Sequence, residues 1–489
     1  MSARCLISLN NYILMLLLLL ILTPLIAALV SCASKNHRAL EAVTVTAASL
    51  GFILWAFIAK QIILTGRYSY LPFFSVDALG IIVLFTVALI GAAVAFYSVG
   101  YIRIEVAKGI INTRVQEYYI LINLFLLAMF FAITTVNPIL MWIAIEATTL
   151  STALLVSFYN KPSTIEAAWK YLLINSVGLL LSFFGTLLFL TAVSRTGTAS
   201  FLDWQTLVAS AGNLEPLITK IAFIFVLVGF GTKVGFAPMH TWKPDAYTKT
   251  PTPVTALFSG SLLNVALFAI LRFKMVTDTA LGASFSQNLL LFFGLFSIII
   301  AAFIMLVQKN YKRLFAYSSI EHAGIMALGF GFGGIGASAA VLHMVYHSIA
   351  KSLLFFTSGN IFLKYSSTKL AQVRGVLTTL PVTGVLLIIG FLAIAGIPPF
   401  GIFITEFYIL SAGISEHPIL VTVAIAALAL VFVGLLRHVV GLLYSKQEEH
   451  IPVGEFSLWT VVPPVVLLII LIVLSLYLPL SLRLLLNAV

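Results

Sequence analysis

The stretch Gly229-Phe-Gly-Thr-Lys233-Val-Gly-Phe-Ala-Pro238 interrupts a long apolar run with a lysine, three glycines and a proline. A proline removes an i→i−4 hydrogen bond and kinks or breaks a helix. Broken backbone at membrane depth is tolerated only where protein or a wet cavity covers it. A lysine at the centre of a membrane helix costs about 2.5–3.5 kcal/mol, so it usually faces the interior of a bundle. The stretch therefore predicts a broken membrane helix inside a helical bundle.

A second stretch, Ala395-Gly-Ile-Pro398-Pro399-Phe-Gly401, is interrupted in the same style. Two Gly/Pro-interrupted spans at matching positions of two halves indicate inverted repeats. We expect three helices in residues 1–116, a first five-helix repeat in 117–274, a second in 284–444, and a last helix in 455–489.

Composition agrees with a membrane protein, because 61% of the 489 residues are hydrophobic and 9% are charged. An ordinary soluble domain has about 25% charged residues. About fourteen apolar runs have the length that a bilayer requires. The sequence predicts an all-α polytopic membrane protein with about fourteen transmembrane helices, of which the seventh (217–237) and twelfth (380–410) are broken.

The net charge of +11 comes largely from short loops. Loops after odd-numbered spans carry about twice as many Lys and Arg as loops on the other side, which the positive-inside rule places in the cytoplasm. Both termini are then expected outside a multi-pass protein of the cell membrane. No basic run is interleaved with aromatic residues, so no nucleic-acid partner is predicted.

The N-terminal residues allow two interpretations. Arg4, the apolar run Leu14–Leu22 and Cys32 are compatible with a lipoprotein signal. The stretch from about Tyr12 to Val30 is also long enough for an ordinary first membrane helix, which we expect over 11–33. The two cysteines, Cys5 and Cys32, cannot supply the four thiolates of an iron–sulfur cluster. We predict no cofactor in the chain, so the energy source lies in a partner or in the membrane gradient.

Five charged residues lie inside or at the edge of predicted spans, and such residues commonly mark an ion or proton path: Glu146, Lys170, Lys233, Lys351 and Glu406. Glu146 is a candidate partner for an intramembrane lysine, or an acid that reaches the interface. Lys233 is either a proton switch or half of a fixed ion pair. Glu406 follows the second break, and the alternative for it is an acid near the membrane surface.

Glu166 and Lys170 are four residues apart, so a simple helix-supporting surface pair is the alternative to a functional Lys170. His343, His347 and Lys351 share one helical face. No third ligand for a zinc ion is evident beside the two histidines, and no metal site is predicted. Imidazoles suit a proton relay, whereas satisfied core histidines are the alternative. Glu321 and His322 are able to join the row.

These segments together resemble the antiporter-like membrane subunits of respiratory complex I, Mrp-type cation/proton antiporters and group 4 nickel–iron hydrogenases. The resemblance rests on the run Lys233–Asp245, on Pro251-Thr-Pro-Val-Thr-Ala-Leu-Phe-Ser-Gly, on Phe315-Ala-Tyr-Ser-Ser-Ile-Glu-His322 and on His343-x3-His347-x3-Lys351. Ile145-Glu-Ala-Thr-Thr-Leu150 and Glu166-Ala-Ala-Trp-Lys170-Tyr are most similar to the F-type subunit of hydrogenase-4 and formate hydrogenlyase relatives.

The resemblance implies roles on a proton path. Glu146 matches a fifth-helix glutamate, Lys170 a sixth-helix lysine, and Lys233 a seventh-helix lysine paired with that glutamate. Positions of a central hydrophilic axis are matched by His322, His343, His347 and Lys351, and a twelfth-helix acid by Glu406. Asn264 departs from the pattern, since many relatives have Lys or His there and an amide does not titrate.

The implied function is that of a proton-translocating, non-redox subunit in a multisubunit oxidoreductase complex of the membrane, of the group 4 hydrogenase or formate hydrogenlyase type. Implied partners are other antiporter-like and anchor subunits, the lipid bilayer, and peripheral redox subunits with nickel–iron or iron–sulfur centres. A quinone-linked subunit like those of complex I, a sodium/proton antiporter subunit, a non-conducting membrane anchor and a solute permease remain as alternatives.

Overall fold

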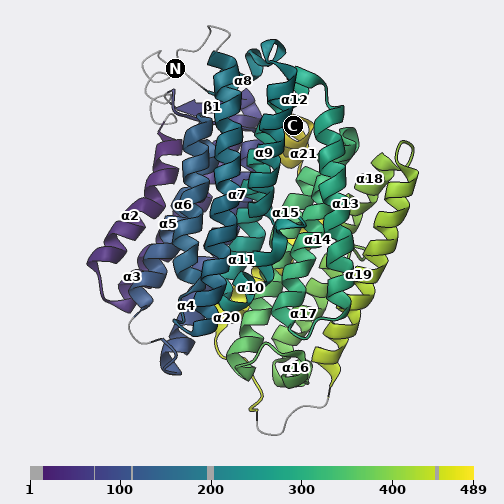
Figure 1. Ribbon diagram of the computed structural model, residues 1–489. Coiled ribbons are helices and arrows are strands. Elements are labelled where there is room, and N and C mark those ends of the chain that lie inside the picture. Colours follow the sequence, from purple (N-terminus) through teal and green to yellow (C-terminus); the bar gives the residue numbers. More distant parts are fainter. Residues whose placement is uncertain (1–14, 71, 112–113, 195–202, 446–450, 489) are drawn as a thin grey trace.

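A computed structural model describes residues 15–70, 72–111, 114–194, 203–445 and 451–488. Long helices run side by side in a bundle (Figure 1), so the predicted all-α membrane fold is confirmed. One addition was not predicted: a small antiparallel hairpin of β1 (Arg67–Tyr70) and β2 (Phe74–Asp77). The signal-like residues up to 14, including Arg4 and the start of the span predicted at 11–33, lie outside the described residues.

The helices of the first half follow the predicted spans closely. They are α2 (Leu16–Ala33), α3 (His37–Thr65), α4 (Ala78–Ala107), α5 (Val115–Thr134), α6 (Pro138–Val156), α7 (Pro162–Ser194), α8 (Trp204–Ala209), η1 (Ala211–Asn213), α9 (Pro216–Val234), η2 (Met239–Thr241), α10 (Trp242–Lys249), α11 (Thr252–Leu257), η3 (Phe258–Leu262) and α12 (Leu263–Leu281).

The second half continues in the same manner. Its helices are α13 (Ser284–Leu306), α14 (Tyr311–Phe332), α15 (Gly334–Tyr365), η4 (Leu370–Gln372), α16 (Val376–Thr379), α17 (Pro381–Ile394), α18 (Gly401–Gly413), α19 (Pro418–Tyr444), α20 (Leu458–Leu476) and α21 (Leu480–Asn487).

Local sequence explains where several helices begin. The side chain of Asn137 accepts hydrogen bonds from the first backbone N–H groups of α6, and Pro138 occupies its first turn. Asp77 caps α4 and Asn310 caps α14 in the same way. These short polar side chains satisfy N–H groups that have no partner within the helix.

Both predicted helix breaks are present. Helix α9 ends at Val234 and is followed by Gly235 with φ 86°, then by η2 and α10. Helix α17 ends at Ile394, and α18 begins at Gly401 after Gly396 with φ 65°. Left-handed backbone of this kind favours glycine, so the two glycines fix where each helix stops.

Twelve segments of the described chain are long and apolar enough to cross a membrane. Helix α14 and the pair α17 and α18 are not among these segments, so the count of fourteen stays a prediction. Helix α14 is buried along most of its length and contains Glu321 and His322.

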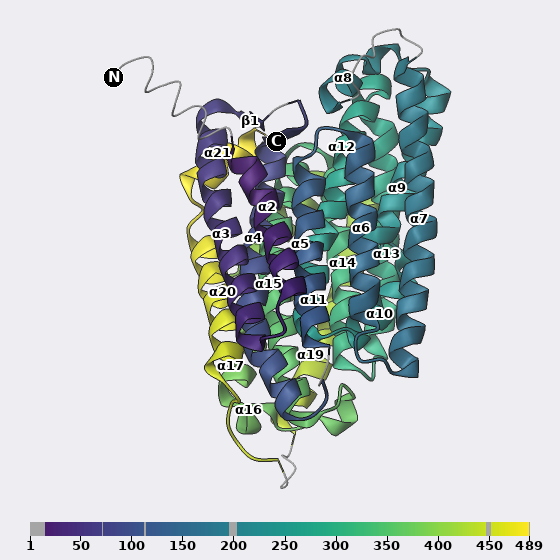
Figure 2. The same cartoon turned by 90° about the vertical axis from the view of Figure 1, so that its left-hand side faces the viewer.

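The two ends of the bundle differ. The hairpin, α8 and α21 lie at the upper end in Figure 1, and α16 lies at the lower end; Figure 2 shows the same arrangement from the side. By the predicted spans, Lys243 and Lys312 belong to loops and count among the cations from which the orientation is expected. That assignment was wrong, because both side chains are buried and hydrogen-bond within the protein: Lys243 lies in the first turn of α10, just after the first break, and Lys312 lies at the lower end of α14.

Helix α15 occupies the centre of the second half. It packs against α4, α11, α14, α17, α18 and α20. The span from α11 to α12 is also enclosed on all sides. Polar side chains on these two segments are therefore held inside the protein, away from lipid.

Candidate functional site

Lys233 lies buried at the end of α9, beside the first break. Its Nζ donates to Thr149 Oγ1 on α6 at 2.9 Å and to Tyr171 OH on α7 at 2.8 Å. Tyr171 OH also shares a 2.6 Å hydrogen bond with Thr152 Oγ1. Two neighbouring helices, α6 and α7, thus supply oxygen atoms to one lysine, and these oxygens compensate part of the cost of burying it.

Glu146 lies one helical turn before Thr149 on α6 and is partly buried. Its carboxylate accepts from Thr149 Oγ1 at 3.2 Å and from Ser176 Oγ at 3.0 Å. In the described chain no ion pair joins Glu146 to Lys233. The two are connected instead through the Thr149 hydroxyl, which accepts from the lysine and donates to the carboxylate.

The first break leaves backbone carbonyls at the end of α9 without helical partners, and buried side chains satisfy them. Lys243 Nζ donates to Val234 O at 2.8 Å, and Trp242 Nε1 donates to Thr232 O at 2.9 Å. A Cβ on Gly235 would lie 2.8 Å from the Lys243 side chain. The break is therefore a packed, hydrogen-bonded structure that holds Lys233 in place.

A second cluster forms where α14, α15 and α18 meet. His322 Nδ1 and His343 Nε2 lie 3.0 Å apart, His322 Nε2 lies 3.1 Å from Ile394 O, and His343 Nδ1 lies 2.8 Å from Thr405 Oγ1. A carbonyl only accepts, so His322 Nε2 carries its hydrogen. With both rings neutral, His343 then donates to His322 and accepts from the Thr405 hydroxyl.

The Thr405 hydroxyl has more than one possible hydrogen-bond partner, so this row can adopt a second hydrogen-bonding arrangement. Its hydroxyl is also within reach of Ile402 O at 2.9 Å and Gly401 O at 3.2 Å. A proton arriving at His343 Nδ1 would turn the hydroxyl toward these carbonyls, because the nitrogen then donates. The row can hold or pass a proton with only small movements.

Glu406 places its carboxylate against the second break. A Cβ on Gly396 would lie 2.3 Å from Glu406 Oε2, so the absence of a side chain there makes room for the acid. Glu406 Oε1 lies 3.9 Å from His322 Nδ1. Glu321 approaches the same imidazole, with Oε2 at 3.4 Å from His322 Nε2 but without hydrogen-bond geometry.

His347 and Lys351 continue the row along α15, and both are buried. Lys351 Nζ donates to Phe315 O at 3.0 Å. The His347 ring lies 5.3 Å from the His322 ring, centre to centre, and neither of its nitrogens has a hydrogen-bond partner among the described residues. Buried polar atoms normally find partners, so His347 marks a place where the row needs a water molecule or a moving neighbour.

Lys170 does not join these buried groups. Its side chain is 49% exposed, and it pairs with Glu166 at 2.6 Å and with Asp245 at 3.6 Å. Asp245 also pairs with Arg313. This surface network ties α7, α10 and α14 together at the rim of the first cluster.

Asn264 lies between the clusters, directly after the π-helical turn η3. Its Nδ2 donates to Ser348 Oγ at 2.7 Å and to Met344 O at 3.2 Å on α15. Its Oδ1 has no partner among the described residues. π-Helical turns are frequent at functional sites, and the open Oδ1 offers an acceptor next to the Lys351 face of α15.

Glu105 is a further buried acid that was not among the predicted site residues. Its carboxylate is fully buried on α4, and accepts from Tyr159 OH at 2.7 Å. The buried ammonium group of Lys312 attracts the same carboxylate electrostatically. Lys312 Nζ also donates to Thr252 Oγ1 at 2.7 Å. Tyr159 and Lys312 line an opening of about 260 Å³ at the lower end of the bundle. The only sequence signal was a glutamate near the end of an apolar span.

Three side chains offer atoms that could hold a metal ion: His322, His343 and Glu406, whose ligand atoms lie within 4.8 Å of one another. The sequence analysis considered a different histidine pair, His343 and His347. In the structure His343 Nε2 donates a hydrogen bond to His322 Nδ1. The lone pair of His322 Nδ1 that a metal ion would need is therefore occupied by this hydrogen bond.

The family model described as "NADH:quinone oxidoreductase/Mrp antiporter, TM" matches residues 135–432, more than half of the chain. The chain belongs to this family. A relative named "Hydrogenase-4 component F homolog" from Methylacidiphilum infernorum is 42% identical over 353 residues, covering 71% of this chain and 74% of the relative. "F(420)H(2) dehydrogenase subunit M" from Methanosarcina mazei is 27% identical over 431 residues, covering 84% of each chain.

Solved structures of membrane complexes share the fold. A chain of the membrane-bound sulfane sulfur reductase, "an archaeal respiratory membrane complex", superposes with a TM-score of 0.86 at 23% identity, covering 98% of this chain and 96% of that one. The family match includes all eight residues that the sequence analysis selected. The resemblance stated from motifs is thereby confirmed.

Proposed function

We propose that this chain is a proton-translocating subunit of a multisubunit membrane-bound respiratory complex, of the group 4 nickel–iron hydrogenase or formate hydrogenlyase type. The observation that carries the proposal is the row of buried, hydrogen-bonded titratable groups at the two helix breaks. Inert core residues would not need basic and acidic side chains at a cost of several kcal/mol each. The similarity to a hydrogenase-4 component F homolog supports the hydrogenase-type branch.

In the first cluster, the charge of Glu146 sets how firmly Lys233 keeps its proton. A carboxylate near a buried lysine favours the charged ammonium, and desolvation favours the neutral amine. When a neighbouring subunit changes the charge or position of Glu146, the Thr149 bridge transmits the change to Lys233. The lysine then releases or retains its proton.

The released proton moves toward Lys351 on the central helix. Asn264 and the unpartnered nitrogens of His347 mark a gap that water has to fill, because no hydrogen bond crosses it within the described chain. Beyond the gap, the row of His322, His343 and Thr405 carries the proton to Glu406. Glu105 and Lys312 are placed for uptake from the lower end, and Lys170 supports the first cluster from its rim.

The two breaks support the proposal of inverted repeats over 117–274 and 284–444. Each has a positive-φ glycine in contact with a charged side chain, namely Gly235 with Lys243 and Gly396 with Glu406. We place the lower end of the bundle in the cytoplasm and both termini outside, since the excess of loop cations lies at the lower end. Peripheral subunits with nickel–iron or iron–sulfur centres would supply the redox energy.

Proton pumping by the whole complex in sealed vesicles tests the proposal. Lys233→Ala and Glu406→Ala are expected to lower pumping at least tenfold while the complex still assembles. The control variant is Arg38→Gln, because Arg38 is exposed and has no ion-pair partner among the described residues. Proton pumping at the parental rate in both site variants would contradict the proposed proton relay. Uptake of sodium coupled to proton release would instead assign the path to sodium/proton exchange. If the double variant Glu146→Gln/Lys233→Met leaves the coupling of redox chemistry to pumping unchanged, the chain would be a structural membrane anchor.

A further inference from the structure

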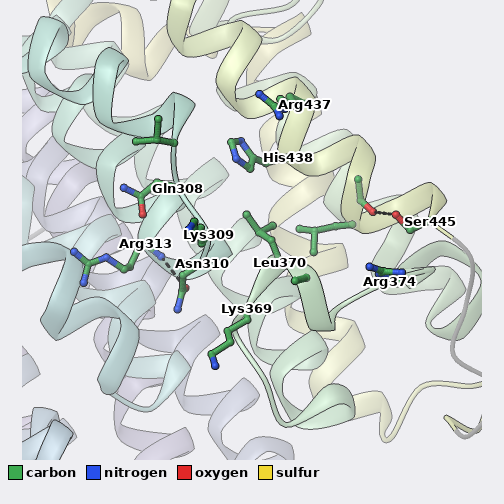
Figure 3. A pocket seen from close by; sticks show the side chains of 14 residues that line it. Gln308, Lys309, Asn310, Arg313, Lys369, Leu370, Arg374, Arg437, His438 and Ser445 are labelled. Atoms are coloured by element: carbon green, nitrogen blue, oxygen red, sulfur yellow. Dashed lines mark hydrogen bonds between the residues drawn. The ribbon is translucent and has the colours of Figure 1, made fainter.

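A wide, open pocket of the described chain lies outside the proton row. It has a volume of about 1020 Å³ and opens at the lower end, between the α13–α14 connection, the segment around η4, and the last turns of α19. Figure 3 shows side chains from these three segments facing one space. Its five Lys and Arg residues are Lys309, Arg313, Lys369, Arg374 and Arg437.

Within the described part of the chain, most of this positive charge has no acidic partner. Among the described lining residues there is no Asp or Glu. Arg313 pairs with Asp245, whereas the other four cations form no ion pair within the described part of the chain. His438 directs Nδ1 to Gly434 O, and its Nε2 has no hydrogen-bond partner among the described residues. Such a concentration of unpaired cations favours a ligand with negative charge.

The backbone around the pocket is already ordered. Leu370 N donates to Lys309 O at 3.0 Å, and Tyr311 N donates to Thr368 O at 3.1 Å. Asn310 Nδ2 donates to Thr368 Oγ1 at 2.7 Å. These bonds tie the segment around η4 to the start of α14, so a ligand would not need to order this part of the wall, which lowers the cost of binding.

The helices above the pocket present apolar surface. Helix α19 touches α13 closely at Gly434, where a Cβ would lie 3.4 Å from the Met305 backbone. One turn further along α19, Arg437 lines the pocket. Phe303 on α13 and Val433 on α19 are 61% and 53% exposed, although both are large and apolar. Cations at a helix end with apolar surface above them match the two parts of a phospholipid.

We propose that this pocket binds the phosphate-bearing headgroup of an anionic phospholipid, with its acyl chains along α13 and α19. Basic pockets between membrane helices bind such headgroups, and each Lys or Arg near an anionic surface contributes about 1 kcal/mol. The site is independent of the proton path. An acidic segment of a partner subunit is the competing occupant, and the experiment separates the two.

Binding of dioctanoyl-phosphatidylglycerol to the purified full-length protein in detergent, at about 150 mM salt, tests the site. The variant Lys369→Gln/Arg374→Gln/Arg437→Gln is expected to bind on the order of 100-fold more weakly. The matched control Lys35→Gln/Arg38→Gln/Arg483→Gln removes three other exposed cations and should stay within about twofold of the parent. Arg437 is exposed and forms no ion pair with any residue that the structure describes, so Arg437→Gln alone should weaken binding about fivefold. This single variant tests the site if the triple variant unfolds.

Three results would overturn the proposal. The first is equal affinity for dioctanoyl-phosphatidylcholine, which lacks net charge. The second is full displacement of the lipid by millimolar inorganic phosphate, which would assign the pocket to the free anion. The third is a pocket variant that binds lipid like the control but loses a partner subunit when the whole complex is purified.

Discussion

Within the described part of the chain, the hydrogen-bond connection from Lys233 to Glu146 runs through the hydroxyl of Thr149. That hydroxyl accepts from Lys233 Nζ at 2.9 Å and donates to the carboxylate at 3.2 Å. A direct ion pair would hold both charges permanently. A single rotatable hydroxyl between them lets a change at Glu146 alter the proton affinity of the lysine without moving either backbone.

The Thr149 bridge leads to a first prediction. Thr149→Val keeps the shape of the side chain but removes the bridge, and hydrogen bonds to charged groups contribute about 1.5–3 kcal/mol. We expect proton pumping per turnover in sealed vesicles to fall at least fivefold. Thr148→Val is the matched control, because Thr148 Oγ1 donates only to Ile145 O of its own helix. Equal pumping in the two variants would show that the bridge is not used.

The two histidines of α15 should respond in opposite ways to loss of their rings. His343→Leu leaves His322 Nδ1 and the Thr405 hydroxyl without a shared partner, so the protein should lose about 1–3 kcal/mol of stability. His347→Leu removes two nitrogens that lack partners among the described residues, so stability should be unchanged or rise by about 1 kcal/mol. Thermal unfolding in detergent measures both.

Pumping by the same variants separates stability from function. If His347 belongs to the proton row, His347→Leu yields a stable complex whose pumping is lost. A stable His347→Leu protein that pumps normally would remove this residue from the path and leave His322, His343 and Thr405 as the conducting row.

Gly396 is expected to tolerate no side chain. In Gly396→Ala a methyl group would lie 2.3 Å from Glu406 Oε2, and the backbone has φ 65°. Strain of this kind costs about 1–3 kcal/mol, so the melting temperature should fall. Proton pumping by the complex should also fall, because Glu406 is displaced. Gly212→Ala is the control, since nothing lies near its added methyl group. Adding Glu406→Asp to Gly396→Ala shortens the acid and should recover part of the stability; a fully stable single variant would contradict the expected strain.

The ion pair between Arg272 and Asp77 at the upper end should make the stability of the protein depend on pH. Asp77 caps α4 and receives two hydrogen bonds from Arg272, at 2.6 and 2.8 Å. Burial raises the pKa of Asp77, but the Arg272 guanidinium and the Gly80 N–H together outweigh it, and the pKa lies below its ordinary value. A lowered folded pKa stabilises the protein above the unfolded pKa of about 3.9, and this contribution is lost as pH falls through the folded pKa.

Melting temperatures of parent and Asp77→Asn between about pH 6 and pH 3 measure this contribution. The variant should be about 2–3 kcal/mol less stable near neutrality, because Arg272 loses its partner, and the difference should shrink in acid. Glu117→Gln disrupts the more exposed Arg114–Glu117 pair and should cost less than about 1 kcal/mol at every pH. A constant difference between parent and Asp77→Asn across the range would contradict the assignment.

The residue types and their order determined the membrane fold, the two broken helices and most of the titratable row. Apolar runs of bilayer length, and glycine and proline inside two of them, act locally, so their consequences are visible in the chain itself. His343, His347 and Lys351 share a face for the same local reason.

Only the tertiary structure decided which charged groups are buried together. It placed Lys170 at the surface, put Thr149 between Lys233 and Glu146, and gathered His322, His343 and Thr405 from three helices. It also buried Lys243, Lys312 and Glu105, although the chain places them near helix ends. Helix packing brings together atoms that are distant in sequence, and the burial of a charge depends on all of those neighbours at once; no local pattern contains that information.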